Sequence, residues 1–209
     1  MDNSLNALEI RVLGTLIEKE STTPEYYPMS LTGLLAACNQ KTSRFPVTDS
    51  SEGDILEGIA GLRSRGYAAE ISGSGRVTKF AQRFTEKINL GRRETAVLCI
   101  LMLRGPQTAG EIKGRTERMY AFGDLEEVET VLRKLSERPE GPLAQKLPPM
   151  PGMKEPRYAQ MLGGPVETTA YGDAIPQKSG DRLSTVEAEV ARLREELDEL
   201  RRRFDALAL

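Results

Sequence analysis

Apolar residues recur with the strictest spacing near the end of the chain, from Leu183 to Leu207, at alternating steps of three and four. This is the heptad rhythm of a coiled coil, in which a narrow apolar seam packs against a partner helix. The seam residues, at the a and d positions, are Leu183, Val186, Val190, Leu193, Leu197, Leu200, Phe204 and Leu207. The alternative is a helix that folds back onto its own domain, although such a helix usually has a wider apolar face.

Charged residues beside the seam favour a parallel pair of helices. In a parallel, in-register pair, each g position faces the e position of the next heptad in the partner. The three pairs formed in this way are attractive: Arg182–Glu187, Glu189–Arg194 and Glu196–Arg201. In a centred antiparallel pair, Glu189 would face Glu196, and the two carboxylates would repel each other. The sequence therefore predicts a parallel homodimer through a coiled-coil helix over 182–209.

The first part of the chain predicts three helices followed by a β-hairpin. Asn6 with Glu9 forms a capping box, and Ser30 has the position of a second helix cap. Helical spacing of apolar residues and strand-like runs then predict the elements Leu5–Glu18, Ser30–Cys38, Ser51–Arg65, Tyr67–Ile71 and Val77–Phe80. The turn SGSGR, 72–76, joins the two strands.

The same order occurs a second time. Leu90–Leu101 aligns on the first helix at an offset of 85, and Ile55, Ile59, Leu62 and Arg65 correspond to Val128, Leu132, Leu135 and Arg138. The further elements predicted are helices that begin at Thr108 and Asp124, and strands at Leu143–Leu147 and Arg157–Leu162. Three helices followed by a hairpin, occurring twice, is the winged-helix plan. The expected fold is thus mainly α with small β-hairpins (α+β), as two winged-helix domains in tandem (1–88 and 89–162), a flexible linker (163–181) and the coiled-coil helix (182–209).

Composition excludes several classes of protein and of site. The net charge is −2 and the pI is about 5.5, so any nucleic-acid contact must be local. The chain has no histidine, which excludes the histidine-dependent triads and metal sites. Its two cysteines, Cys38 and Cys99, lie in apolar helical contexts and are expected to be buried, reduced thiols. With no membrane-length apolar run and no signal peptide, we expect a cytoplasmic protein that is not an enzyme and needs no cofactor or metal.

Several stretches resemble a known family. The blocks ACNQKT, 37–42, and RMYAF, 118–122, together with LEIRVLGTLIEKE near the start, are similar to the YceH-like family of bacterial proteins. The resemblance covers about Leu5 to Leu162. It implies two winged-helix domains in tandem, and a terminal coil is common in that family. It implies no reaction, ligand or established site.

Cations gather in two segments of the first domain that contain no carboxylate. The loop NQKTSRFPVT, 39–48, and the segment 72–83, which includes the wing, supply the candidate nucleic-acid contacts Asn39, Gln40, Lys41, Arg44, Arg76, Lys79 and Arg83. The amides could contact base edges, and Phe45 adds a face on which a base could stack. The alternative is that Asn39 only ends the second helix and that the loop cations are merely solvated.

The third helices argue against the usual docking mode of a winged helix. The first begins with Glu52, Asp54 and Glu57, and the second carries Glu126 and Glu127, so both would turn acids towards phosphate. Acids in a first turn also simply favour the helix N-terminus. The favoured function is nucleic-acid binding, to DNA in a regulatory role, through the wing and the loop. The alternative is a protein–protein interaction scaffold, which the acidic helices would permit and which a neutral apolar groove would favour.

Overall fold

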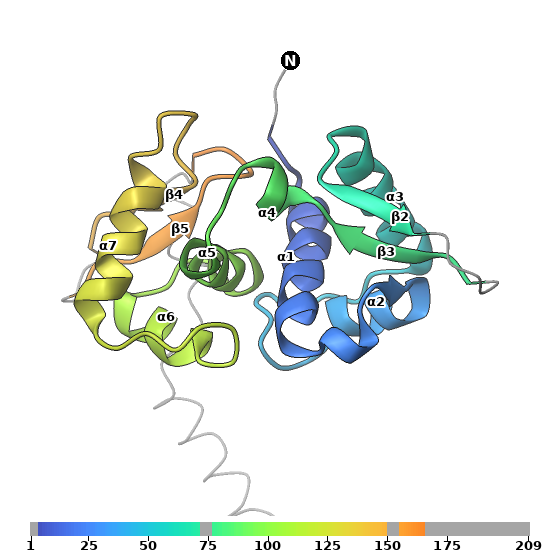
Figure 1. The fold of residues 1–209 in the computed structure, drawn as a ribbon, viewed down its shortest axis with the longest axis horizontal. Helices are drawn as coiled ribbons and strands as arrows, with labels where there is room; N and C mark the ends of the chain where they lie inside the picture. Colours follow the sequence, from blue (N-terminus) through green and yellow to red (C-terminus); the bar gives the residue numbers. More distant parts are fainter. Residues whose placement is uncertain (1–3, 72–76, 150–154, 166–209) are drawn as a thin grey trace, which may run out of the picture. The chain divides into compact units, whose positions relative to one another are not determined.

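A computed structural model describes residues 4–71, 77–149 and 155–165 of the chain. This part is mainly helical, with two small antiparallel sheets, as the sequence predicts (Figure 1). The predicted coiled-coil helix, 182–209, lies outside the described residues, and so does most of the predicted linker.

The first repeat begins with a capped helix and ends with a hairpin and a short helical turn. Its elements are α1 (Ala7–Thr22), the turn η1 (Pro24–Tyr26), β1 (Met29–Ser30), α2 (Leu31–Cys38), α3 (Glu52–Ser64), β2 (Ala68–Ile71), β3 (Lys79–Gln82) and α4 (Phe84–Lys87). Asn6 caps α1, and Glu9 completes the capping box as predicted. α1 continues beyond the predicted end at Glu18, because the Thr22 hydroxyl and the Thr23 amide bond the carbonyls of its last turn. No pattern in the sequence predicts β1 or α4, which are only two and four residues long.

The second repeat has the same order of helices and strands. It comprises α5 (Arg92–Arg104), α6 (Ala109–Thr116), α7 (Leu125–Ser136), β4 (Ala144–Lys146) and β5 (Tyr158–Gln160). Thr108 and Asp124 cap α6 and α7 through the amides of Glu111 and Glu127, as predicted. Each cap satisfies a backbone N–H at a helix start that has no partner inside the helix.

The sheets repeat as well. In the first repeat the strand order is β1-β3-β2, with Met29 paired to Phe80 and Ala69 paired to Ala81. In the second repeat β4 pairs with β5, and an isolated bridge joins Gln107 to Tyr158. That bridge precedes α6 as β1 precedes α2, so both repeats attach the start of the second helix to the last strand.

An arginine at the end of each third helix ties the repeat together. Arg65 donates to the carbonyl of Ser4 at 3.3 Å, and its counterpart Arg138 donates to the carbonyl of Ile88 at 2.9 Å. Both carbonyls belong to the segment that leads into the first helix of the repeat. The correspondence of Arg65 with Arg138 in the sequence is therefore matched by a shared structural role.

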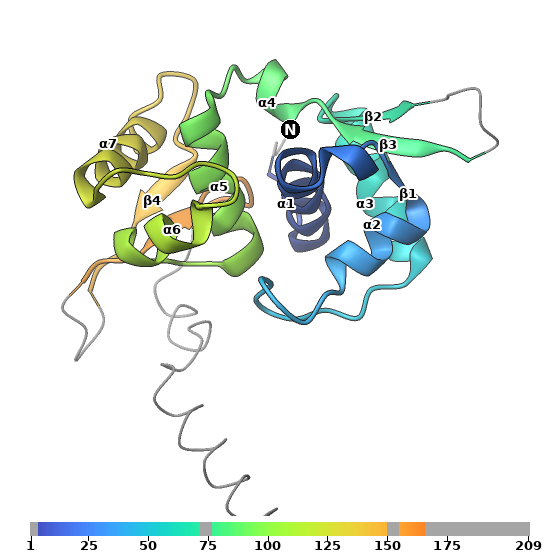
Figure 2. The same cartoon turned by 60° about the horizontal axis from the view of Figure 1, so that its bottom comes forward.

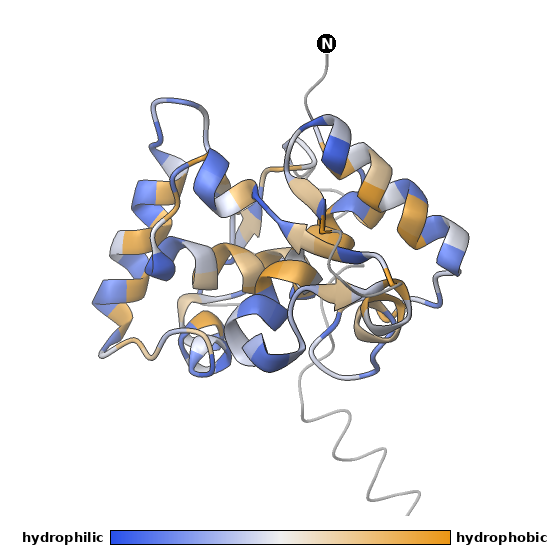
Figure 3. Ribbon diagram, turned by 45° about the vertical axis from the view of Figure 1, so that its right-hand side comes forward, coloured by the Kyte–Doolittle hydropathy of each residue, from blue (hydrophilic) through white to orange (hydrophobic). Residues whose placement is uncertain are grey.

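Two hydrophobic cores form, and the first helices of the two repeats pack against each other. Ile55, Ile59 and Leu62 lie in one core, and Val128, Leu132 and Leu135 lie in the other. α5 contributes to both, since Leu98 and Met102 belong to the first core and Val97 and Leu101 to the second. Figure 2 shows α1 and α5 side by side in the middle of the described part, and hydrophobic residues concentrate there in Figure 3.

The contact between α1 and α5 joins equivalent positions. The Cys99 thiol donates to the carbonyl of Gly14 at 3.3 Å, and these two residues are 85 positions apart, which is the repeat offset. Both cysteines are free and buried, as predicted. Burial raises the pKa of each thiol, so both stay protonated at neutral pH. No helix in the described ranges is long and apolar enough to cross a membrane.

Candidate functional site

The loop between α2 and α3 is held in place by the side chain of Asn39. The side-chain amide donates to the carbonyl of Ser50 at 2.8 Å and accepts from the Ser50 amide at 2.9 Å. The Gln40 side chain also forms hydrogen bonds within the protein. Its amide nitrogen donates to the carbonyl of Thr42, and its amide oxygen accepts from the Lys19 ammonium at 3.3 Å. Both amides that were expected to contact base edges therefore make bonds within the protein.

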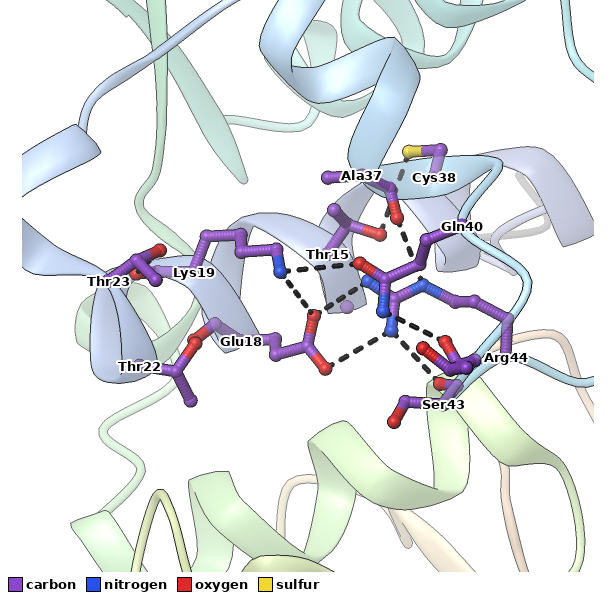
Figure 4. A network of polar contacts seen from close by, with 12 residues as sticks. Thr15, Glu18, Lys19, Thr22, Thr23, Ala37, Cys38, Gln40, Ser43 and Arg44 are labelled. Atoms are coloured by element: carbon purple, nitrogen blue, oxygen red, sulfur yellow. Dashed lines mark hydrogen bonds and ion pairs between the residues drawn. The ribbon is translucent and has the colours of Figure 1, made fainter.

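Arg44 belongs to this loop, and its side chain lies in a buried polar network (Figure 4). Its guanidinium bonds both carboxylate oxygens of Glu18, at 3.1 and 2.6 Å, and its Nε donates to the carbonyl of Ala37. The Arg44 side chain is fully buried, and that of Glu18 is 14% exposed. Burial would raise the pKa of Glu18, but the hydrogen bonds and charge of Arg44 outweigh it, so this pKa lies below its ordinary value.

The sequence predicts Arg44 as a nucleic-acid contact, but in this structure its buried guanidinium is bonded within the protein. Its charge is satisfied by Glu18, a residue 26 positions earlier on α1. Local sequence shows only an arginine in a polar loop, because the carboxylate that draws it inward belongs to another element. Arg44 therefore stabilises the fold of the loop.

The same loop also contacts the second repeat. The Phe45 amide donates to the carbonyl of Leu103 at 2.8 Å, and Arg104 donates to the Ser43 hydroxyl at 2.6 Å. From α1, the Arg11 guanidinium donates to the carbonyl of Pro46. The segment 43–46 is thus a brace between the repeats, and Phe45 is half-buried there.

The remaining predicted cations lie apart from one another. Lys41 is exposed on the loop, Lys79 on β3 and Arg83 just after β3, where Arg83 lies 3.8 Å from Glu86. Arg76 lies outside the described residues. In Figures 1 and 2 the loop after α2 reaches towards α5, whereas the β2–β3 hairpin extends away from the second repeat. The loop and the hairpin therefore extend in different directions from the first repeat.

A groove lies between α3 and the β2–β3 hairpin. It encloses about 480 Å³, and its apolar lining includes Leu56 and Ile59 from α3, with Val77 and Phe80 from the hairpin side. Two of these side chains are unusually open to solvent for apolar residues, Leu56 at 46% and Val77 at 62%. The charges at its edge, Arg63 and Glu70, neutralise each other at 2.8 Å.

Glu70, paired with Arg63, is the one acid among the described lining residues, and further acids lie on α3. Glu52 and Glu57 are exposed on α3, as the sequence indicates, and Asp54 caps the helix by accepting from Ser51. That hydrogen bond holds the pKa of Asp54 below its ordinary value. The surface thus combines a neutral, apolar groove with a negatively charged helix start.

Within the described ranges, no three acidic or cysteine side chains are grouped closely enough to hold a metal ion. One residue that the sequence reasoning did not single out is Arg11, which is 6% exposed in the middle of α1. The available signal was its position in IRVLGTLI, 10–17, where it is the one charged residue in a run that is otherwise apolar or small. A helix that is apolar on nearly all sides is buried, and a charge within it is buried too.

Comparisons with known proteins give one consistent family. A family model described as "Protein of unknown function, DUF480" matches residues 5–153. The "UPF0502 protein" of Solibacter usitatus is 49% identical over 209 residues, which cover 98% of this chain and 100% of that protein. The "UPF0502 protein" of Pelobacter propionicus is 46% identical over 98% of this chain and 97% of its own length, and that of Citrifermentans bemidjiense is 44% identical over 91% and 90%. The chain therefore belongs to the DUF480/UPF0502 family, the bacterial YceH-like proteins that its sequence resembles.

Proposed function

We propose that the two repeats are winged-helix domains arranged in tandem, and that the first is a protein-interaction module. Support for the fold comes from the order of three helices and a hairpin, and from the sheet order β1-β3-β2. The second repeat retains the corresponding link between Gln107 and Tyr158. The proposed role is non-catalytic.

The observation that carries the interaction role is the exposed apolar pair at the groove between α3 and the hairpin. Leu56 and Val77 lie on its two walls and keep about half of their surface in solvent. Contiguous apolar surface rimmed by polar residues is typical of protein-binding sites. The carboxylates of Glu52 and Glu57 would repel a duplex but attract a basic segment beside the groove. The partner that fits is a protein segment with an apolar anchor and basic flanking residues.

Substituting the groove residues tests this role. Leu56→Asp and Val77→Asp place a charge where an apolar anchor would bind, and both positions are exposed enough to preserve the fold. We expect each variant of the full chain, retrieved from nuclease-treated lysate, to lose at least about tenfold of its co-purifying protein. Leu125→Asp is the matched control, since Leu125 is 49% exposed and lies on α7 in the other repeat. Equal loss in all three variants, or no partner after nuclease treatment, would contradict the proposal.

Nucleic-acid binding by the wing of the first domain is a second candidate. It is favoured by the exposure of Lys79 and Arg83 on the hairpin side. If these cations contact phosphates, affinity for random duplex DNA falls steeply with salt. Lys79→Ala should then make the log–log slope shallower by about one, whereas Lys134→Ala, at an exposed lysine of α7, should leave it unchanged. Absence of binding at low salt would eliminate this candidate and leave the groove.

We also propose that residues 182–209 form a parallel homodimer, on the strength of the heptad pattern and its attractive g–e pairs. Light scattering should give a dimer for the full chain and a monomer for a chain that ends at Gly164. Leu197→Asp, at a central a position, should dissociate the dimer by placing a charge in the seam. Ala188→Asp, at an outward f position, should leave it intact. A dimer that survives both the truncation and Leu197→Asp would place dimerisation elsewhere.

A further inference from the structure

A cavity of about 450 Å³ lies between the two repeats, beneath the brace formed by residues 43–46. Its walls come from α1, the loop after α2, the end of α5 and strand β5. Most of the lining is apolar, and the larger side chains are Leu8, Ile10, Phe45, Leu101 and Met102. Its volume falls within the range of small-molecule sites, which is about 300–1,000 Å³.

One charged side chain lines this apolar cavity. Arg11 is 6% exposed, and its Nη2 donates to the carbonyl of Pro46. Its Nη1 is buried and has no hydrogen-bond partner in the described part of the chain. A buried guanidinium with an unused donor is costly, because the solvation it loses is not replaced. Nη1 is closed off from the cavity by its neighbours, so a ligand would bond it once the guanidinium turns towards the cavity.

Within the described residues, no carboxylate forms an ion pair with Arg11. The charge of Glu18 acts on Arg11, but Glu18 is already bound by both terminal nitrogens of Arg44. The neighbouring Cys38 contributes no negative charge, because its buried thiol stays protonated. Arg11 thus has no carboxylate partner of its own within the described residues.

We propose that this cavity binds a small organic carboxylate with an apolar body. The guanidinium of Arg11 would turn so that Nη1 donates to the carboxylate, and the apolar body would pack against Leu8, Leu101 and Met102. Guanidinium groups suit this role because their planar fork matches a carboxylate and makes strong, charge-assisted bonds. Thr48, Ser50 and Gln160 add further polar groups at the lining. Such a ligand would contact α1 in the first repeat and α5 and β5 in the second at once.

Calorimetric titration of the full chain tests the site. The probes are octanoate and phenylacetate, each compared with its uncharged amide, and inorganic phosphate serves as an anion without an apolar body. We expect the carboxylates to bind at least tenfold more tightly than their amides or phosphate. Arg11→Met should weaken carboxylate binding by at least tenfold, because the variant removes the guanidinium while keeping an unbranched apolar stem. Arg11→Lys should retain part of the affinity.

Two further variants keep the test decisive. Ala7 is exposed and lines the cavity, so Ala7→Trp should narrow the mouth without disturbing a core and weaken binding at least fivefold. Arg92→Met makes the same chemical change as Arg11→Met at an exposed position of α5 and should bind normally. Equal binding of amides and carboxylates, binding only of phosphate, or no binding at all would overturn the proposal. Unchanged affinity in Arg11→Met would do so too, and Ala7→Trp decides the matter if Arg11→Met does not fold.

Discussion

Replacing Arg44 with methionine is expected to lower the free energy of unfolding by about 3 kcal/mol, because it leaves the carboxylate of Glu18 buried without its main partner. Removing one member of a buried ion pair typically costs about 3–5 kcal/mol. We expect the lower end, since Glu18 is 14% exposed and Lys19 lies 3.5 Å away. Chemical denaturation followed by circular dichroism measures the change.

Two further variants make this prediction specific. Arg83→Met removes an exposed cation that is 3.8 Å from Glu86 and should change stability by less than about 1 kcal/mol. Combining Arg44→Met with Glu18→Leu removes both charges and should recover much of the loss. If Arg44→Met lowers the free energy of unfolding no more than Arg83→Met does, the ion pair between Arg44 and Glu18 does not hold the loop.

The same ion pair should produce a defined pH dependence. In the folded protein the pKa of Glu18 lies below its ordinary value of 4.5, so the stabilisation is fully present above that value. It is lost as the pH falls through the lower, folded pKa, because the carboxylate then becomes protonated. The stability difference between wild type and Arg44→Met should therefore narrow in acid. A difference that widens as the pH falls would contradict the assignment.

The second large loss of folding stability is expected from a substitution at Gly14, where α1 and α5 approach each other. A Cβ atom added there would lie 3.0 Å from a methyl carbon of Leu103 and 3.1 Å from the Cβ of Met102. Gly14→Val adds two further methyl groups to this contact and should cost about 2–3 kcal/mol through overpacking. Thermal unfolding of the full chain monitors the loss.

Gly114 provides the matched control. It lies in the interior of helix α6, and an added Cβ there would meet no atom within 4 Å. Valine has a somewhat higher helix propensity than glycine, so Gly114→Val should change stability by less than about 0.5 kcal/mol. Equal effects of the two substitutions would mean that the helix interface tolerates the larger residue and that α1 and α5 are not tightly packed.

These two predictions bear on the proposed roles because they concern how the repeats are held together. The brace at 43–46 and the α1–α5 contact both connect the repeats, and the cavity lined by Arg11 lies beside them. The groove beside Leu56 lies on the first repeat, between α3 and the hairpin. Substitutions at Leu56 and Val77 should therefore affect partner binding without weakening this connection.

The sequence by itself determined the features that depend on residues a few positions apart. The caps at Asn6, Thr108 and Asp124 are each set by a residue three positions on, and apolar spacing within one helix identified Ile59 and Leu132 as core. The repeat could also be predicted from the sequence, and the corresponding residues Arg65 and Arg138 make similar hydrogen bonds in the structure. The short strand β1 could not be predicted, because two residues show no periodicity and the strand is defined only by its pairing with β3.

Only the tertiary structure decided which charged residues are available to a ligand. Arg44 and Lys41 stand three positions apart in the same polar loop, yet one is buried against Glu18 and the other is exposed. The difference arises from a carboxylate on α1, which no pattern within the loop reveals. Arg11 is similar, because its burial depends on α5 and on the loop closing over α1. Propensity and periodicity act over one helical turn, whereas the desolvation of a charge depends on every element that packs around it.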